Sequence, residues 1–362
     1  MNPIRIESGG AGARIRQPGF VLVAVLILLV VLSLLAGSVA LISQRAVAEA
    51  RADVEAFEGE LDAISTRETV LLLLASQPMT LAGLTVDDRA TGRIVAADED
   101  IDGLAVMPIG NEIRLDSHVY AGVGQALFAL QDGRGLFSPN FAPAQARIAF
   151  YQAMGADVGL QGDLDAKRLD YQDPDDLLRI GGAERPQYLA AGLPPPSNRP
   201  VSTPLEFRRI LGWNTLLAPH DDAYLLRMLT VDRNVVLNVN SAPHEVLTLF
   251  PGVTPEIADR IVALRRTSPF TSVAQVQQLV PTLGEDPEFL TLFGGSGGNL
   301  TVWNRNAGTA RLFHWTLTPY HDGGHPWRID YEVTLPRGNT EASRTAARPD
   351  SSLFAPQDAP GG

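Results

Sequence analysis

Cysteine is missing from this chain of 362 residues. Its absence excludes disulfide cross-links, thiolate metal sites and cysteine nucleophiles. The remaining composition is that of a folded protein, because 45% of the residues are hydrophobic and 19% are charged. A chain of this length and composition can bury a sizeable core, and we expect about two domains with additional segments.

Catalytic motifs are missing as well. The sequence has no Gly-x-Ser-x-Gly elbow, no phosphate-binding loop and no His-Glu-x-x-His. His321, Asp322 and His325 lie close together, but no third strong ligand accompanies them, so a polar hairpin tip explains them better than a metal site. A membrane-anchored enzyme with a carboxylate pair stays an alternative without a motif behind it. We therefore predict that the protein is not an enzyme.

Charged residues are absent from Phe20 to Ile42. At about 1.5 Å per helical residue this stretch is roughly 35 Å long, enough to cross a bilayer core. Arg5, Arg14 and Arg16 precede it, so the positive-inside tendency places the N-terminus in the cytoplasm and the chain from Ser43 onward outside. A cleaved secretory signal is the alternative, but its apolar region is usually about 7 to 15 residues long.

The rest of the chain is acidic. The first nineteen residues have a net charge of +2, from three arginines and one glutamate. Since the whole chain has a net charge of −12, the remaining residues have a net charge of −14. Such a body repels phosphate backbones and permits cations or basic partners, although solubility alone also explains it.

The junction between the leader and the apolar stretch carries a processing signal. The basic leader ends in Arg16-Gln17-Pro18-Gly19 and is followed at once by Phe20. This pattern resembles a prepilin cleavage site, which implies cleavage between Gly19 and Phe20 and N-methylation of Phe20. Pilin-like subunits usually have Glu at the fifth mature position, where this chain has Ala24. A subunit without that carboxylate has no neighbouring amine ahead of it to pair with in the bilayer.

The apolar helix is expected to continue beyond the membrane. Val54, Phe57, Leu61 and Ile64 keep helical spacing, and Pro78 is the first strong stop. A helix over residues 20–77 would be roughly 85 Å long. A coiled-coil stalk is the alternative to a pilin-like helix that packs on a globular head.

The outer part changes character twice. Short alternating runs between residues 94 and 120 predict strands, and residues 141–292 read as mostly helical. Two further alternating runs, 310–317 and 327–335, predict a β-hairpin. The tail over 337–362 is rich in Pro, Ser, Gly and Asp and is expected to be disordered.

Residues 241–279 read as two short helices with a hairpin turn, followed by a third helix. Ser241 is expected to cap the first helix and Thr254 the second, with Ile257, Ile261 and Leu264 on its inner face. The arrangement resembles the helix-hairpin-helix units of DNA-binding proteins. Its turn lacks the second glycine, so packing or a protein contact is the preferred role, and a membrane-tethered DNA receptor is the alternative function.

Six short local motifs follow one another along the chain, and their order is informative. They are DGRGLFSPN at 132–140, LDYQDPDD at 169–176, GAERPQY at 182–188, NRP at 198–200, LEFRR at 205–209 and LNVNSAP at 237–243. Together with the processing site and Ala24, this succession is similar to the K-type minor pseudopilins of bacterial type II secretion systems. The resemblance covers about residues 16–335.

The resemblance implies both a fold and a function. The fold is α+β, a pilin-like long helix packed on a small antiparallel sheet, interrupted by a large all-α inserted domain. The function is to initiate or cap the pseudopilus tip for export of folded proteins across the outer membrane. The implied partners are the I-type and J-type minor pseudopilins, then the H type, the major pseudopilin, the prepilin peptidase and the inner membrane, with no nucleic acid.

These readings divide the chain into six segments. Residues 1–19 are the leader, 20–42 the membrane helix and 43–140 the first part of the pilin-like body. The inserted domain takes 141–300, the closing strands 301–336 and the tail 337–362.

No cofactor is required by this function, but members of the family can bind calcium, and acidic turns offer suitable oxygen ligands. Asp173, Asp175 and Asp176 are one candidate Ca²⁺ site. Asp98, Glu99, Asp100 and Asp102 are the other. Solvated turns are the plain alternative.

Overall fold

The computed structural model describes residues 20–87, 107–284, 289–320, 324–337 and 346–355. It confirms the α+β class with a long N-terminal helix and an antiparallel sheet. The chain divides into two compact units, residues 1–58 and 59–362, which we describe separately.

Helix α1 (Phe20–Ser76) ends before Pro78, within one residue of the predicted end at residue 77. Its N-terminal part, up to Glu58, belongs to the first unit. The side chains from Phe20 to Ile42 are exposed, and an 18-residue window of α1 has a mean hydropathy of 3.2. Among the described helices it is the one long and apolar enough to cross a membrane.

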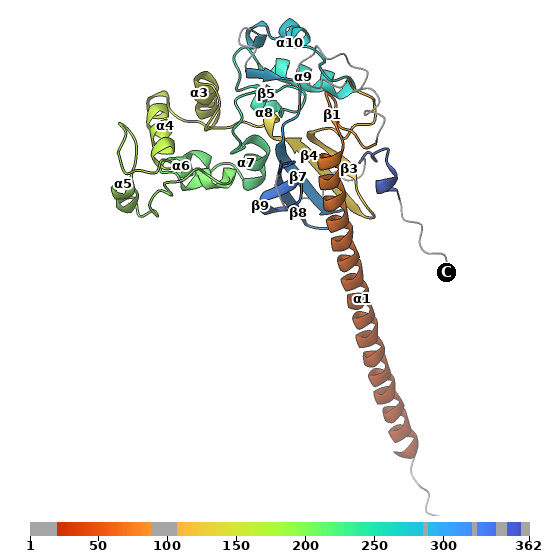
Figure 1. Cartoon of the computed structure of the whole chain (residues 1–362). Coiled ribbons are helices and arrows are strands. Elements are labelled where there is room, and N and C mark those ends of the chain that lie inside the picture. The colour runs from red at the N-terminus through yellow and green to blue at the C-terminus, as the bar shows by residue number, and fades with distance from the viewer. Residues whose placement is uncertain (1–19, 88–106, 285–288, 321–323, 338–345, 356–362) are drawn as a thin grey trace, which may run out of the picture. The chain divides into compact units, whose positions relative to one another are not determined.

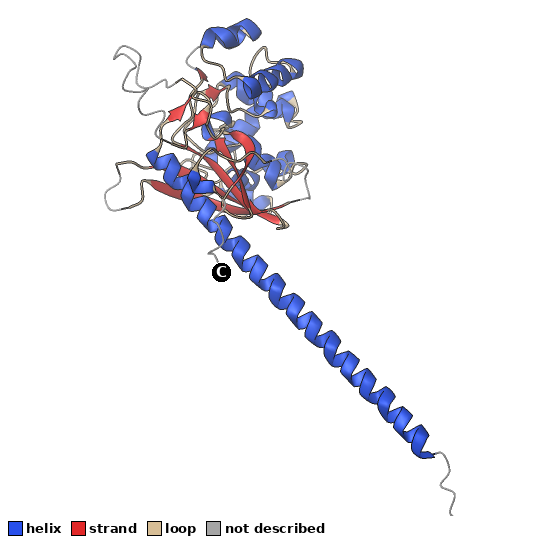
Figure 2. Ribbon diagram, turned by 90° about the vertical axis from the view of Figure 1, so that its right-hand side faces the viewer, coloured by secondary structure: helices blue, strands red, loops and turns tan. Residues whose placement is uncertain are grey.

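The second unit is built on a five-stranded antiparallel sheet in the order β3-β4-β7-β8-β9. Its strands are β3 (Asp116–Ala121), β4 (Ala126–Asp132), β7 (Gly297–Asn304), β8 (Thr309–Leu317) and β9 (Trp327–Pro336). The end of α1 crosses one face of the sheet (Figure 2), where Val70 and Leu74 share a core with Phe128 and Trp315.

The predicted hairpin is confirmed, since β8 and β9 pair antiparallel over the expected residues. Strand β4 was missed because all seven of its residues are buried. Phe128 faces the core under α1 and Leu127 faces a second cluster on the other side. A strand covered on both faces has no polar alternation to detect. The run that starts at Leu104 was expected to be a strand, but residues 107–109 are not in one, and 104–106 lie outside the described residues.

The insertion lies between β4 and β7 and is helical as predicted (Figure 1). It contains α3 (Ala144–Ala153), α4 (Gln161–Asp170), α5 (Arg185–Ala190), α6 (Trp213–Leu217), α7 (Asp222–Met228), α8 (His244–Leu247), α9 (Pro255–Thr267) and α10 (Val273–Leu279). The 3-10 turns η2 (Val158–Leu160) and η3 (Pro204–Arg209) precede α4 and α6. Because β7 starts at Gly297, the closing strands begin before the expected residue 301.

Two small strand pairs complete the second unit. β1 (Met79–Thr80) pairs with β2 (Gly83–Leu84) just after α1. β5 (Leu237–Asn238) pairs in parallel with β6 (Leu290–Thr291) and so joins the two ends of the helix-hairpin-helix-like unit.

The expectation of a disordered tail is wrong for residues 346–355. The Ala121 N–H donates to Ala347 O at 2.7 Å, which ties the tail to the edge of the sheet. The 3-10 turn η7 (Ser352–Phe354) then buries Phe354, which is 1% exposed and stacks on Phe128. The polar composition of the tail concealed this single aromatic anchor, and one buried phenyl ring is enough to order a short segment.

Candidate functional site

Asn238-Val239-Asn240, within the LNVNSAP motif, forms a junction in the interior of the second unit. The Asn240 amide donates to the carbonyls of Leu81 (3.3 Å), Phe270 (3.0 Å) and Leu292 (3.2 Å). Its Oδ1 accepts from the Phe270 N–H at 2.8 Å. One side chain therefore holds together three segments that are far apart in sequence.

Asp132, at the end of β4, is the second part of this junction and is 1% exposed. Its Oδ1 accepts from the backbone N–H groups of Gly295 (2.8 Å) and Arg134 (3.1 Å). Its Oδ2 accepts from Asn238 Nδ2 (2.7 Å) and Ser241 Oγ (2.8 Å). Burial raises the pKa of the Asp132 carboxyl, and these four hydrogen bonds to the carboxylate oppose that shift.

Ser241 is therefore not the helix cap that the sequence predicted. Its hydroxyl is buried on Asp132, and α8 begins three residues later, at His244. The Thr254 cap is confirmed, since its hydroxyl accepts from the Ile257 N–H and Pro255 opens α9. The two caps look alike in sequence, and tertiary contacts decide between them.

The inner face of α9 also differs from the prediction. Leu264 is 43% exposed, and the next residue, Arg265, is buried in its place. The Arg265 guanidinium donates to the carbonyls of Val239 (2.8 Å) and Ala242 (2.6 Å), and burial lowers its pKa to about 10. This basic side chain therefore stabilises the interior of the unit by bonding two backbone carbonyls.

The hairpin turn before α9 is partly covered. Gly252 has a φ of +81°, as a tight turn requires. Thr282 Oγ1 donates to Pro251 O at 2.9 Å and stands where a side chain on Gly252 would point. The turn thus packs against its own chain at the position where related units approach a phosphate.

A row of polar side chains, which sequence reasoning missed, joins the sheet to the insertion. Gln131, Asn299 and His314 lie side by side on neighbouring strands. Gln131 donates to Ser241 O (3.1 Å), Asn299 donates to Leu226 O (3.2 Å), and His314 Nε2 lies 3.0 Å from Asp232 Oδ1. The strand period of two could have placed these residues on one face, but only the pairing of distant strands shows the row.

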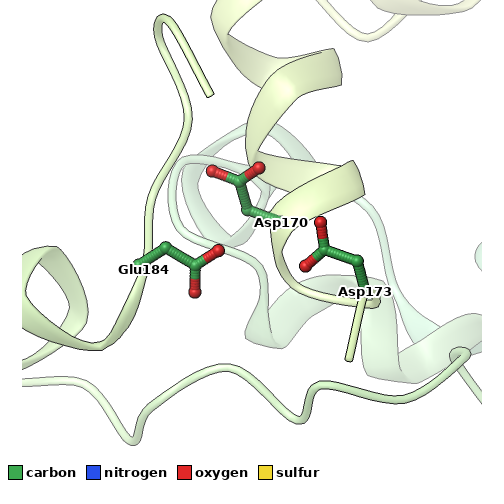
Figure 3. A group of neighbouring side chains, drawn as sticks. All are labelled: Asp170, Asp173 and Glu184. Atoms are coloured by element: carbon green, nitrogen blue, oxygen red, sulfur yellow. The ribbon is translucent and has the colours of Figure 1, made fainter. Parts of the chain in front are cut away.

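An acidic cluster lies in the insertion, where α4 ends and α5 begins. Asp170 is the last residue of α4, Asp173 follows in the next turn and Glu184 precedes α5. One carboxylate oxygen from each lies within 4.8 Å of the others. Figure 3 shows the carboxylates of Asp173 and Glu184 extending toward one another, with Asp170 between them on the end of α4.

The cluster is only half satisfied. Arg179 Nη1 lies 2.6 Å from Asp170 Oδ1 and also contacts Asp173 Oδ2, while Ala183 N–H donates to Asp170 Oδ2 at 2.9 Å. Both carboxylate oxygens of Glu184 and Oδ1 of Asp173 are buried and accept no hydrogen bond from any residue that the structure describes. Glu184 is 2% exposed, and burial together with the neighbouring carboxylates raises its pKa to about 7.

Of the acidic residues predicted as a calcium site, the structure brings only Asp173 into this cluster. Asp175 and Asp176 are exposed, where Asp175 accepts from the Leu177 N–H and Asp176 from Asn198. The spacing of Asp170 and Asp173 by three residues at a helix end was a usable signal. Glu184 carried none.

The other residues singled out from the sequence are either outside the described part of the chain or away from the acidic cluster. Asp98, Glu99, Asp100, Asp102, His321, Asp322 and Gly19 lie outside the described residues. His325 stacks on Trp327 at 5.1 Å. Phe20 is the first residue of α1, and Ala24 is exposed in its second turn.

Comparison with known proteins points to the junction rather than to the acidic cluster. Residues 237–293 match the family model of protein K of the type II secretion system. A chain in the crystal structure of the GspK-GspI-GspJ complex from enterotoxigenic Escherichia coli is similar at a TM-score of 0.45 and 13% identity, covering 80% of this chain and 100% of that chain. No curated protein matches the chain.

Proposed function

We propose that this protein is a K-type minor pseudopilin of a type II secretion system. The observation that carries the proposal is the match of residues 237–293 to the protein K family, a segment that contains Asn240 and two of its three carbonyl partners, Phe270 and Leu292. A long helix with an uncharged N-terminal stretch and an antiparallel sheet that receives its end are the expected companions of that unit.

The contacts of the junction support a structural role for the helix-hairpin-helix-like unit. Arg265 is turned inward, and Thr282 Oγ1 bonds to Pro251 O and occupies the space beside Gly252 in the hairpin turn. Backbone amides at such a turn bind a phosphate only where the ligand can approach them. We therefore infer a packing role and expect no retardation of duplex DNA in a gel-shift assay at low salt.

Two features favour a position at the pseudopilus tip. Ala24 provides no carboxylate for the amine of a subunit ahead, and an unpaired charge in a bilayer is costly. The insertion adds eight α-helices between β4 and β7 among the described residues, a bulk that would obstruct another subunit stacked above. The mature protein would lie in the inner membrane with its bulk in the periplasm, and other minor pseudopilins would pack along α1.

Complex formation with I-type and J-type minor pseudopilins tests the proposal. Leu61 and Ile64 continue the apolar stripe of α1 and remain partly exposed, so they are available to neighbouring helices. Leu61→Asp with Ile64→Asp in the full chain is expected to lower co-purification with the two partners at least about tenfold, since charges would face an apolar helix.

Val158→Asp with Leu160→Asp is the matched control, because both residues are similarly exposed but belong to the 3-10 turn η2 (Val158–Leu160) of the insertion. It should leave co-purification unchanged. The absence of a complex with the unsubstituted chain would contradict the proposed function.

We also propose that Asp170, Asp173 and Glu184 hold a divalent cation, with Ca²⁺ the best candidate. The fit rests on three buried carboxylate oxygens that have no hydrogen-bond partner within the described part of the chain, since buried charges otherwise require pairing. Calcium prefers carboxylate and carbonyl oxygens and tolerates irregular geometry. Bound there, it would offset most of the negative charge of the cluster and tie the start of α5 to the end of α4.

Substitution at Glu184 tests this site. Glu184→Gln removes the charge that lacks any partner and is expected to weaken Ca²⁺ binding at least about thirtyfold by isothermal titration calorimetry. Asp176→Asn removes an equal charge from an exposed carboxylate outside the cluster and should change the Kd less than about threefold. Equal losses in both variants would argue for a diffuse acidic surface instead of a site.

A further inference from the structure

Arg179 lies in the segment that links the two halves of the acidic cluster. Its guanidinium bonds to Asp170 Oδ1 at 2.6 Å and to Asp173 Oδ2, and its backbone N–H donates to Asp170 Oδ2 at 3.3 Å. It makes no hydrogen bond to Glu184 or to the second oxygen of Asp173, and no other described residue donates to these oxygens. Arg179 is therefore bonded to two of the three carboxylates that the proposed cation would use.

The neighbours of Arg179 have the opposite orientation. Leu177 and Leu178 are more than half exposed, and Ile180 is 101% exposed. The next residue, Gly181, has a φ of +76° and turns the chain back toward Glu184. The guanidinium thus anchors the middle of a short loop, defined here as residues 177–180, whose three aliphatic side chains face solvent.

The charges of the cluster are unbalanced in this arrangement. One guanidinium faces three carboxylates, two of them buried. A divalent ion carries twice the charge of Arg179 and can accept oxygen ligands from all three residues at once. A guanidinium and a divalent ion that share the same carboxylates repel each other strongly in a partly buried site.

We propose that Arg179 competes with the cation for the carboxylates of Asp170 and Asp173. The guanidinium bonds to both carboxylates when no ion is present and leaves them when the ion binds. The inference rests on the proposed calcium site. Cation binding would therefore break the bonds that hold Arg179, and with it the loop 177–180, to Asp170 and Asp173. The loop would become more mobile, and the positions of the exposed side chains of Leu177, Leu178 and Ile180 would change. Arg179 would then set both the affinity of the site and the mobility of this apolar loop.

The experiment compares Arg179→Gln with Arg185→Gln in the full chain. Arg185 is exposed, follows Glu184 directly and has no described bond to the cluster, so its substitution makes the same change in charge nearby. Ca²⁺ should bind Arg179→Gln about ten- to a hundredfold more tightly than the unsubstituted chain, because charge-assisted hydrogen bonds to Arg179 no longer have to be given up. Arg185→Gln should change the Kd less than about threefold.

A second readout follows the loop itself. In the unsubstituted chain, Ca²⁺ should speed deuterium uptake by peptides that cover residues 177–180. In Arg179→Gln, the ion should have little effect on them, since the anchor is already gone. Arg179→Lys, which keeps the charge but cannot bond two carboxylates in the same way, should give an intermediate affinity and guards against misfolding of the glutamine variant.

The outcomes separate the two proposals. No Ca²⁺ binding by any of these chains would remove the calcium site and the competition with it, while leaving the pseudopilin assignment to its own test. Binding that is unchanged or weaker in Arg179→Gln would overturn the competition alone. Equal tightening in both glutamine variants would show a general charge effect and would also overturn it.

Discussion

Asn240→Ala is expected to lower the free energy of unfolding of the second unit by about 4 kcal/mol, because it removes four hydrogen bonds and leaves their backbone partners in the interior. Denaturant unfolding of the full chain, followed by fluorescence of the buried Trp213 and Trp315, measures the change. The loss should appear as a lower midpoint with an unchanged slope.

Asn214→Ala provides the control for this substitution. Asn214 is an exposed residue of α6, and its side chain bonds only to its neighbour Thr215 among the described contacts. The free energy of unfolding should change by less than about 0.5 kcal/mol. A loss below about 1 kcal/mol for Asn240→Ala would show that the junction is not what holds the insertion to the rest of the unit.

Blocking the leader junction is expected to have the largest effect on function. Gly19→Leu should leave an uncleaved chain that begins at Met1, keeps its three leader arginines and has no free amine at Phe20. If the protein starts a pseudopilus, secretion should fall to the level of cells that lack it. Mass spectrometry of the membrane-extracted protein measures cleavage, and the secreted fraction of an exported protein measures function.

Gly37→Ala is the matched control, because Gly37 lies in α1 with open space around it and alanine favours a helix. It should be processed and should support secretion normally. Recovery of the unsubstituted chain with Met1 intact, in cells with an active prepilin peptidase, would contradict the processing assignment. A mature N-terminus near Ser38 would instead indicate an ordinary secretory signal.

Local sequence was sufficient where a structural signal depends on neighbouring residues. The uncharged run from Phe20 to Ile42 and the stop at Pro78 predicted α1 to within one residue at its C-terminal end. Thr254 followed by Pro255 predicted the start of α9, because the cap and the first helical position are adjacent. The alternating runs of β8 and β9 predicted their pairing in the same way.

Errors occurred where a distant contact decided between similar local options. Ser241 had the residue type and position of a cap, but the buried carboxylate of Asp132 took its hydroxyl. Leu264 had the expected apolar spacing, yet Arg265 was buried because two backbone carbonyls were within its reach. Phe354 ordered part of a polar tail because a position beside Phe128 was open to it.

The acidic cluster shows the same division. Asp173 was selected from its local sequence, whereas Glu184 joins it only because the chain turns back after Gly181. The sequence by itself determined the long apolar helix α1, the start of α9 and the hairpin of β8 and β9, because each depends on composition, on adjacent residues or on short-range periodicity. The α+β class followed from the family resemblance of the motifs, and the processing signal stays a prediction. Only the tertiary structure decided which carboxylates meet, which polar residues dock the insertion and which basic side chain turns inward, because burial without a partner is costly and partners come from distant parts of the chain.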